Sequence, residues 1–290
     1  MGLRTKFNVI MVFAYLVGIG GIGWVSFEIL QRNAREEILH IAGLIMENAM
    51  AVRGYTSEEI RPLLSDDAGH DFLPQTVPAY AASRSIEKFR ANYPEYTYKE
   101  ATLNPTNPID RATDWERAII DHFRNNPDEN ELVGVRQTAL GPSMYMARPI
   151  EVDSPGCLSC HGKIQAAPEA MRERYGEANG FGWQMNEIVG SQVVNVPMSV
   201  ALDRAQGAFW AFMITSSGYF LIVMLVANIL LHYVVIKPVK RISDTAHEIS
   251  MGRMEVPEWQ PRGKDEIASL AESFNRMRRS LINAIKLLDE

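Results

Sequence analysis

Two long uncharged stretches constrain the architecture of this chain more than any other feature. Residues 7–27 and 208–236 contain no Asp, Glu, Lys or Arg. About 20 apolar residues in a helix are enough to cross the roughly 30 Å hydrocarbon core of a bilayer. We therefore expect two transmembrane helices, which divide the chain into five segments: 1–6, 7–27, 28–207, 208–236 and 237–290.

The first stretch has a second interpretation, because a cleaved signal peptide also begins with basic residues followed by an apolar run. The run is long for the central part of a signal peptide, and Glu28 follows it where a cleavage site with small residues would be expected. An uncleaved membrane anchor is therefore the favoured interpretation.

Basic residues beside the two stretches predict their orientation. Arg4 and Lys6 precede the first stretch, and Lys237 and Lys240 follow the second. Because Lys and Arg are enriched on the cytoplasmic side of membrane helices, both chain ends are expected in the cytoplasm. The sequence thus predicts a two-pass protein of a bacterial inner membrane, with residues 28–207 in the periplasm.

Two polar residues interrupt the second stretch. Asn228 and His232 lie four residues apart, on one face of the expected helix. Ionisable and polar groups within a membrane are candidates for a functional role. Both residues lie near the cytoplasmic end of the stretch, however, so contact with the membrane interface is the favoured interpretation.

The only two cysteines of the chain belong to one motif, Cys157-Leu158-Ser159-Cys160-His161. This is the spacing of c-type haem attachment, in which two thiols bond to one porphyrin and the adjacent imidazole becomes the proximal iron ligand. A structural zinc site would need further Cys or His ligands, and no second pair is present. A thioredoxin-like redox site would be expected near a βαβ pattern, which the flanking segments lack. The motif therefore predicts one covalent haem c, attached through Cys157 and Cys160 and ligated by His161.

Other residues are candidates for the sixth iron ligand and for the haem pocket. The side chains able to ligate the iron opposite His161 are those of Met46, Met50, His40, Met144 and Met146. Basic side chains that could pair with the haem propionates are those of Arg53, Arg148 and Lys163. Aromatic rings that could form the pocket wall are those of Tyr145, Phe181 and Trp183. For each of these residues, ordinary packing or a solvated surface position is the alternative.

The segment between the two stretches combines helical and strand-like patterns. Apolar residues recur at helical spacing over 33–64, and a second helix is expected over 114–124. Alternating runs predict four strands, over 96–103, 131–139, 143–152 and 187–196. We therefore expect an α+β domain with a long N-terminal helix and with the haem motif inserted between strands.

Apolar residues after the second stretch recur with alternating spacings of three and four. The first helix has this pattern at Val239, Ile242, Ala246 and Ile249, before Gly252. A second helix opens at Asp265 and continues the pattern through Ile267, Leu270, Phe274, Met277, Leu281, Ala284 and Leu288. Such repeats are typical of coiled coils and helical bundles, so they predict association without specifying its purpose.

Two parts of the sequence resemble known families. IKPVKRISDTAHEISMGRMEVPE with KDEIASLAESFNRMRRSL resembles a HAMP domain, in which Pro238 would begin the first helix just inside the membrane. MAVRGYTSEEIRPLL, PGCLSCHGK and YGEANGFGWQMNEIVGSQVVNVPM resemble the single-haem, PAS-like periplasmic domains found between a signal anchor and a HAMP module. The HAMP resemblance implies a parallel bundle formed by two chains, hence a homodimer. The PAS-like resemblance implies that the first helix covers the distal face of the haem, which favours Met46 as the sixth ligand.

These features support two alternative functions. The first is a sensor, in which the redox or ligand state of the haem is relayed through the HAMP helices to a signalling partner in trans, because no kinase, cyclase or methyl-accepting region follows. The second is a membrane-anchored cytochrome that transfers electrons to a partner, with the C-terminal helices as a dimerisation stalk. The net charge of -6 argues against a nucleic-acid partner. No hydrolase or phosphate-binding motif is present, so we expect no enzymatic activity.

Overall fold

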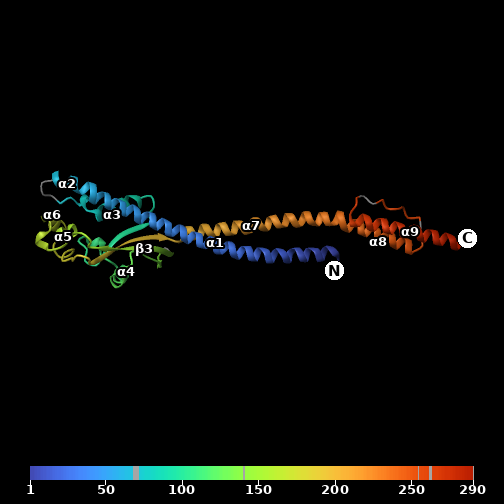
Figure 1. The fold of residues 1–290 in the computed structure, drawn as a ribbon, viewed down its shortest axis with the longest axis horizontal. Helices are drawn as coiled ribbons and strands as arrows, with labels where there is room; N and C mark the ends of the chain where they lie inside the picture. The colour runs from blue at the N-terminus through green and yellow to red at the C-terminus, as the bar shows by residue number, and fades with distance from the viewer. Residues whose placement is uncertain (68–71, 140, 254, 261–262, 290) are drawn as a thin grey trace. The chain divides into compact units, whose positions relative to one another are not determined.

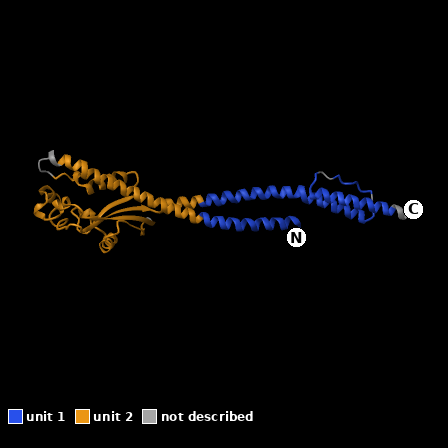
Figure 2. Ribbon diagram, in the orientation of Figure 1, with its two compact units in different colours: residues 1–26, 209–290 blue, residues 27–208 orange. Residues whose placement is uncertain are grey.

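The computed structural model describes residues 1–67, 72–139, 141–253, 255–260 and 263–289 (Figure 1). The chain divides into two compact units, one of residues 27–208 and one of residues 1–26 with 209–290 (Figure 2). Helix α1 (Leu3–Tyr55) and helix α7 (Ser199–Leu230) contribute to both units.

A four-stranded antiparallel sheet forms the centre of the 27–208 unit. Its strands are arranged in the order β1 (Thr97–Thr102), β4 (Ile188–Pro197), β3 (Gly141–Glu151) and β2 (Leu132–Thr138). All four strands lie within a residue or two of the predicted positions, because their alternating side chains match the two faces of a sheet. The α+β prediction is confirmed.

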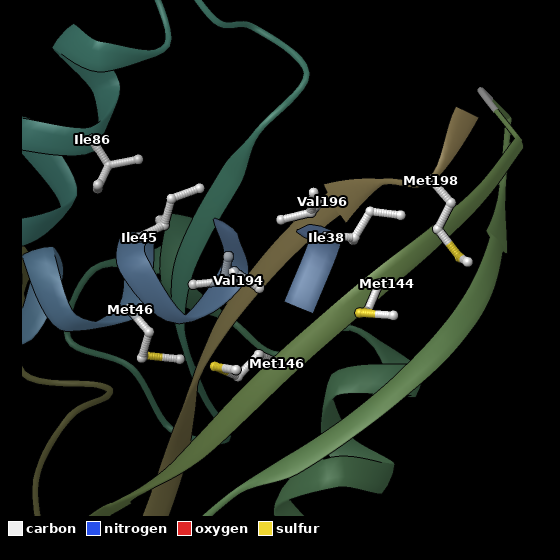
Figure 3. Close-up of a cluster of buried hydrophobic side chains, with 10 residues drawn as sticks. Ile38, Ile45, Met46, Ile86, Met144, Met146, Val194, Val196 and Met198 are labelled. Carbon is white, nitrogen blue, oxygen red and sulfur yellow. The ribbon is translucent and has the colours of Figure 1, made fainter. Parts of the chain in front are cut away.

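Each face of this sheet is covered by one of the predicted helices. On one face, Ile38, Ile45 and Met46 of α1 pack against Met146 of β3 and Val194 of β4 (Figure 3). On the other face, α4 (Asp114–Asn125) packs Ile119 and Phe123 against Ala147 and Val193. The first helix is therefore held against the sheet by apolar burial, which is the main favourable contribution to such packing.

The long first helix continues past α1 through a wider turn. The π-helical segment η1 (Thr56–Ile60) leads into α2 (Arg61–Asp67), and Pro62 follows directly. A proline lacks the N–H of a normal turn, and its ring clashes with the carbonyl four residues earlier, here that of Glu58. A π turn accommodates this clash, so the predicted helix over 33–64 is continuous but locally widened.

Several short helices in this unit were not predicted. They are η2 (Pro74–Thr76), α3 (Pro78–Phe89), η3 (Pro108–Asp110), α5 (Pro155–His161), η4 (Ile164–Ala166) and α6 (Glu169–Tyr175). Most are too short to display a full helical repeat. Proline stands at the first or second position of four of them, where its missing N–H needs no partner, and Pro168 is the N-cap of α6.

The other unit is helical. After α7, the π-helical segment η5 (Leu231–Ile236) precedes Pro238 and leads into α8 (Lys237–Ser250), and α9 (Glu266–Asp289) follows. The continuous helices 3–64 and 199–250 are long and apolar enough to cross a membrane, judged by length and composition alone.

The predicted apolar repeat is buried in part on α8, but not at the predicted positions of α9. On α8, Ile242 and Ile249 are buried. Among the described residues of α9, those that are buried are Ala268, Ala271 and Asn275, each one position after Ile267, Leu270 and Phe274 of the predicted repeat. Leu270, Met277 and Leu281 of that repeat are exposed in the single chain. The side chain of Leu288 lies outside the described residues.

Candidate haem site

The three residues of the predicted haem motif lie on one short helix. Helix α5 begins after Ser154, whose side chain accepts a hydrogen bond from the backbone N–H of Gly156 at 3.2 Å. Cys157, Cys160 and His161 stand at positions i, i+3 and i+4, which share one face of a helix. Both thiols are free and partly exposed. The donor set therefore fits a c-type haem, because two thiols and one imidazole project from the same side of the same turn.

The imidazole of His161 is held in a defined orientation. Its Nδ1 lies 2.8 Å from the backbone oxygen of Gly180 and 3.3 Å from Oγ1 of Thr106. A carbonyl oxygen can only accept, so Nδ1 carries the proton and Nε2 carries the lone pair. Burial lowers the pKa of His161, although the bond to Gly180 opposes this effect. The side chain is thus a neutral imidazole at neutral pH, as a metal ligand requires.

A glycine-rich loop supplies this support. A Cβ at Gly180 would lie 2.1 Å from Oγ1 of Thr106, and the residue has a φ of +85°, so glycine is required here. The loop also donates backbone hydrogen bonds from Gly182 to the oxygen of Gly162 and from Trp183 to the oxygen of His161. The Trp183 ring stacks on the imidazole, with a centroid separation of 4.0 Å. Trp183 therefore contacts the predicted iron ligand directly.

Arg53 reaches the same region from the end of α1. Its guanidinium forms an ion pair with Glu100, and the hydroxyl of Tyr98 donates to the other carboxylate oxygen at 2.8 Å. Burial lowers the pKa of Arg53, but Glu100, Tyr98 and Cys157 together raise it above its ordinary value. Because the thiol group of Cys157 is near enough to affect the pKa of Arg53, Arg53 lies close to the haem motif. The guanidinium of Arg53 is already paired with the buried carboxylate of Glu100.

The other two basic residues predicted to pair with the haem propionates are Arg148 and Lys163. Arg148 pairs through Nη2 with Glu47 at 2.8 Å and with Glu131 at 3.0 Å. Lys163 is exposed at the start of η4.

The other two aromatic residues predicted to form the pocket wall are Tyr145 and Phe181. Tyr145 lies on the α4 face of the sheet, with its ring 5.7 Å from that of Trp115. Adjacent side chains of a strand point to opposite faces, so Tyr145 cannot share a pocket on the α1 face with Met144 or Met146. Phe181 lies in the glycine-rich loop, and its backbone oxygen accepts a hydrogen bond from Asn104 at 3.3 Å.

The candidate sixth ligands fall into two groups. Met46, Met144 and Met146 are buried together between α1 and the sheet (Figure 3). Met50 and His40 are exposed on α1, and His40 contributes to a shallow surface groove with Gly43. Met46 and Arg53 are seven residues apart, hence on the same face of α1 and about 10 Å apart along its axis. The sixth ligand stays a prediction.

Three residues near the motif were missed by sequence reasoning. They are Thr106, Glu100 and Gly180, which contact His161 or Arg53. The closely spaced glycines of the 180–182 segment were the available signal, because paired glycines mark unusual backbone conformations. Nothing in the sequence indicates which side chain Thr106 or Glu100 would meet.

Comparisons with known proteins agree with this organisation. The family model for Tll0287-like proteins matches residues 31–197, and the HAMP domain model matches residues 230–283. A solved structure, the crystal structure of the cyanobacterial heme-protein Tll0287, shares 18% identity with a TM-score of 0.45. That similarity covers 56% of this chain and 95% of the other. No curated protein matches the sequence.

Proposed function

Because the chain belongs to the Tll0287-like family and carries a HAMP domain, we propose that it is a membrane-bound haem c sensor. The sensor relays the redox state of its haem, or the binding of a small diatomic ligand, to a signalling partner in trans. The observation that carries this proposal is the fixed imidazole of His161 on the same helix face as Cys157 and Cys160. The packing of α1 against an antiparallel sheet supports a PAS-like domain.

The residues of α5 would hold the haem. Cys157 and Cys160 would form the two thioether bonds, and Nε2 of His161 would be the proximal ligand. The bound haem supplies one-electron redox chemistry and, when a coordination position is open, binding of small ligands. The bond from Nδ1 to Gly180 fixes the tautomer of His161 and increases the basicity of the ligating nitrogen.

The sixth ligand determines which signal is sensed. A thioether from Met46 would give a six-coordinate iron that responds to electron transfer, whereas a weak or absent ligand would leave a position for a diatomic molecule. Met46 is our first choice, and Met50, His40 and Met144 are the alternatives. We further propose that the protein has no enzymatic activity of its own.

The apolar helices and the HAMP helices suit a relay across a membrane. Helices 3–64 and 199–250 support a two-pass protein of a bacterial inner membrane, with the haem domain in the periplasm. The exposed apolar residues Leu270, Met277 and Leu281 support a homodimer, because a second copy would bury them. A relay requires two bundle states whose free energies depend on the state of the haem.

Optical and resonance spectra of the haem-loaded protein test the sensor proposal. A low-spin spectrum that does not change with NO or CO would exclude direct gas sensing and leave redox sensing. Spin-label distances between copies at position 277, recorded in membranes, should then differ between the oxidised and reduced protein. Unchanged distances, together with rapid haem reduction by a respiratory complex, would refute the sensor and favour an electron carrier.

A further inference from the structure

The two helices that are apolar enough to cross a membrane contact each other along one face of each. Within the unit of residues 1–26 and 209–290, α1 and α7 lie side by side (Figure 2). Their less exposed residues recur every three or four positions, which marks a single helical face. On α1 these include Asn8, Met11, Tyr15, Ile19 and Gly23, and on α7 Met213, Ser217, Phe220, Met224 and Asn228.

Asn228 is the centre of a polar cluster at one end of this contact. Its side-chain amide donates to Oδ1 of Asn8 at 2.8 Å and to the backbone oxygen of Met224 at 2.9 Å. Its Oδ1 accepts from Nε of Arg4 at 3.2 Å. Only 7% of Asn228 is exposed, in a stretch whose side chains are mostly exposed in the single chain. Asn228 therefore faces the other helix of the same chain.

A second polar contact joins the same two helices nearer their middle. The hydroxyl of Tyr15 lies 2.5 Å from Oγ of Ser217. Ser217 donates its own proton to the backbone oxygen of Met213 at 2.8 Å, so Tyr15 is the donor in the contact between the helices. The Tyr15 ring also stacks on Phe220, with centroids 4.0 Å apart. The two helices are thus connected at two levels.

We propose that Asn228, through Asn8 and Arg4, is a positioning residue that fixes the register of the two spans so that they move as a pair. This inference rests on the membrane location in the proposed function. In hydrocarbon, a polar side chain without a protein partner is strongly unfavourable, so hydrogen bonds between helices persist. Rotation of α7, or sliding by one residue, would break the contacts of Asn228 with both residues of α1.

The position of Asn228 along the chain gives this contact a consequence for signalling. It lies directly before η5 and Pro238, where the helix passes through a π turn into α8. A displacement of α7 is therefore shared with α1 before it reaches the HAMP helices. Independent sliding of the second span past the first is excluded while the cluster is intact.

Distances between spin labels on the two spans test this inference in the full chain, reconstituted in lipid nanodiscs. Labels carried by keto amino acids at the exposed positions Ile10 and Leu225 leave the native cysteines untouched. The labelled chain is mixed with an excess of unlabelled chain, so that distances between copies do not contribute, and we expect one narrow distance distribution in the unaltered protein. Asn228→Leu should broaden it and shift it to longer distances, whereas Asn228→Gln, which keeps the amide, should retain the narrow form. Tyr219→Leu, at an exposed position of the same helix, is the matched control.

The same sample separates this inference from the membrane proposal. Membrane insertion is measured independently by the relaxation of the label at position 10. A label in the membrane is relaxed by lipid-soluble oxygen and not by an aqueous nickel complex. An aqueous label would refute the membrane location. An inserted protein whose Asn228→Leu variant keeps the original narrow distribution would overturn the role of Asn228. If Asn228→Leu does not assemble, Asn8→Leu is the substitute test variant, because it removes the hydrogen-bond partner while keeping Asn228. It should broaden the distance distribution in the same way.

Discussion

Replacing Gly180 with alanine should separate His161 from its backbone partner. A Cβ at this position would lie 2.1 Å from Oγ1 of Thr106 and 2.8 Å from its Cα, so the backbone itself must shift. Gly182 is a matched control, because it has a similar φ of +80° but no atom within 4 Å of a built Cβ. The two substitutions share the strain of a left-handed backbone and differ in the collision with Thr106.

The expected loss of stability follows from these two contributions. A residue with a Cβ in the left-handed region costs about 1–2 kcal/mol, and this applies to both variants. The collision at Gly180 adds about 1–3 kcal/mol, a typical value for overpacking. For a domain of this size 1 kcal/mol corresponds to about 2–4 °C, so Gly180→Ala should melt roughly 2–12 °C below Gly182→Ala.

Two measurements on the haem-loaded full chain in detergent check this expectation. Thermal unfolding followed by near-ultraviolet circular dichroism gives the difference in melting temperature. The reduction potential should rise only in Gly180→Ala, because losing the bond from Nδ1 makes the imidazole a weaker donor to the iron. Gly180→Ala combined with Thr106→Gly should recover only part of the melting temperature, because the Cα of residue 106 would still lie 2.8 Å from the new Cβ. Equal melting temperatures and equal potentials for the Gly180 and Gly182 variants would refute the reasoning.

Three further predictions concern the haem and the charges near it. Replacing both Cys157 and Cys160 with serine should abolish covalent haem, seen as loss of the haem-stained band on a denaturing gel while the polypeptide band persists. Met46→Leu conserves volume and should cost less than about 1.5 kcal/mol, yet it should change the low-spin spectrum if Met46 ligates the iron; Met50→Leu, at an exposed position, should not. Burial and the carboxylate of Glu100 raise the pKa of Asp110 from 3.8 to about 6. The folded state therefore binds more protons between these values, and stability falls as pH rises through that window. Asp110→Asn should thus be more stable than the unaltered protein at pH 7 but not at pH 4, as denaturant midpoints at the two pH values would show.

Local patterns predicted the main elements of the fold. Alternating side chains placed all four strands, and helical spacing placed the long first helix, α4 and the two helices after the second apolar stretch. Each of these patterns repeats over many residues, so it reports reliably on a periodic backbone. The short helices α3, α5 and α6 were not predicted, because a few turns supported by tertiary contacts carry little periodicity of their own.

Strand periodicity also shows where the pocket prediction was inconsistent. Met144 and Tyr145 were both assigned to the haem pocket, although neighbouring residues of a strand face opposite sides. In the structure, Met144 packs under α1 and Tyr145 packs near Trp115 on the other face. The predicted strand over 143–152 already implied this separation.

By itself, the sequence predicted the chemistry of Cys157, Cys160 and His161, since the spacing expected for attachment to one porphyrin lies within five consecutive residues. Only the tertiary structure decided what surrounds them. Thr106 meets His161 across 55 residues, Glu100 meets Arg53 across 47, and Asn8 meets Asn228 across 220. Such contacts depend on how separate elements pack, and no local pattern encodes the partner of a single polar side chain. The proposed haem motif is therefore readable from the sequence, whereas the hydrogen bonds that orient His161 and the contact that joins the two long apolar helices required the structure.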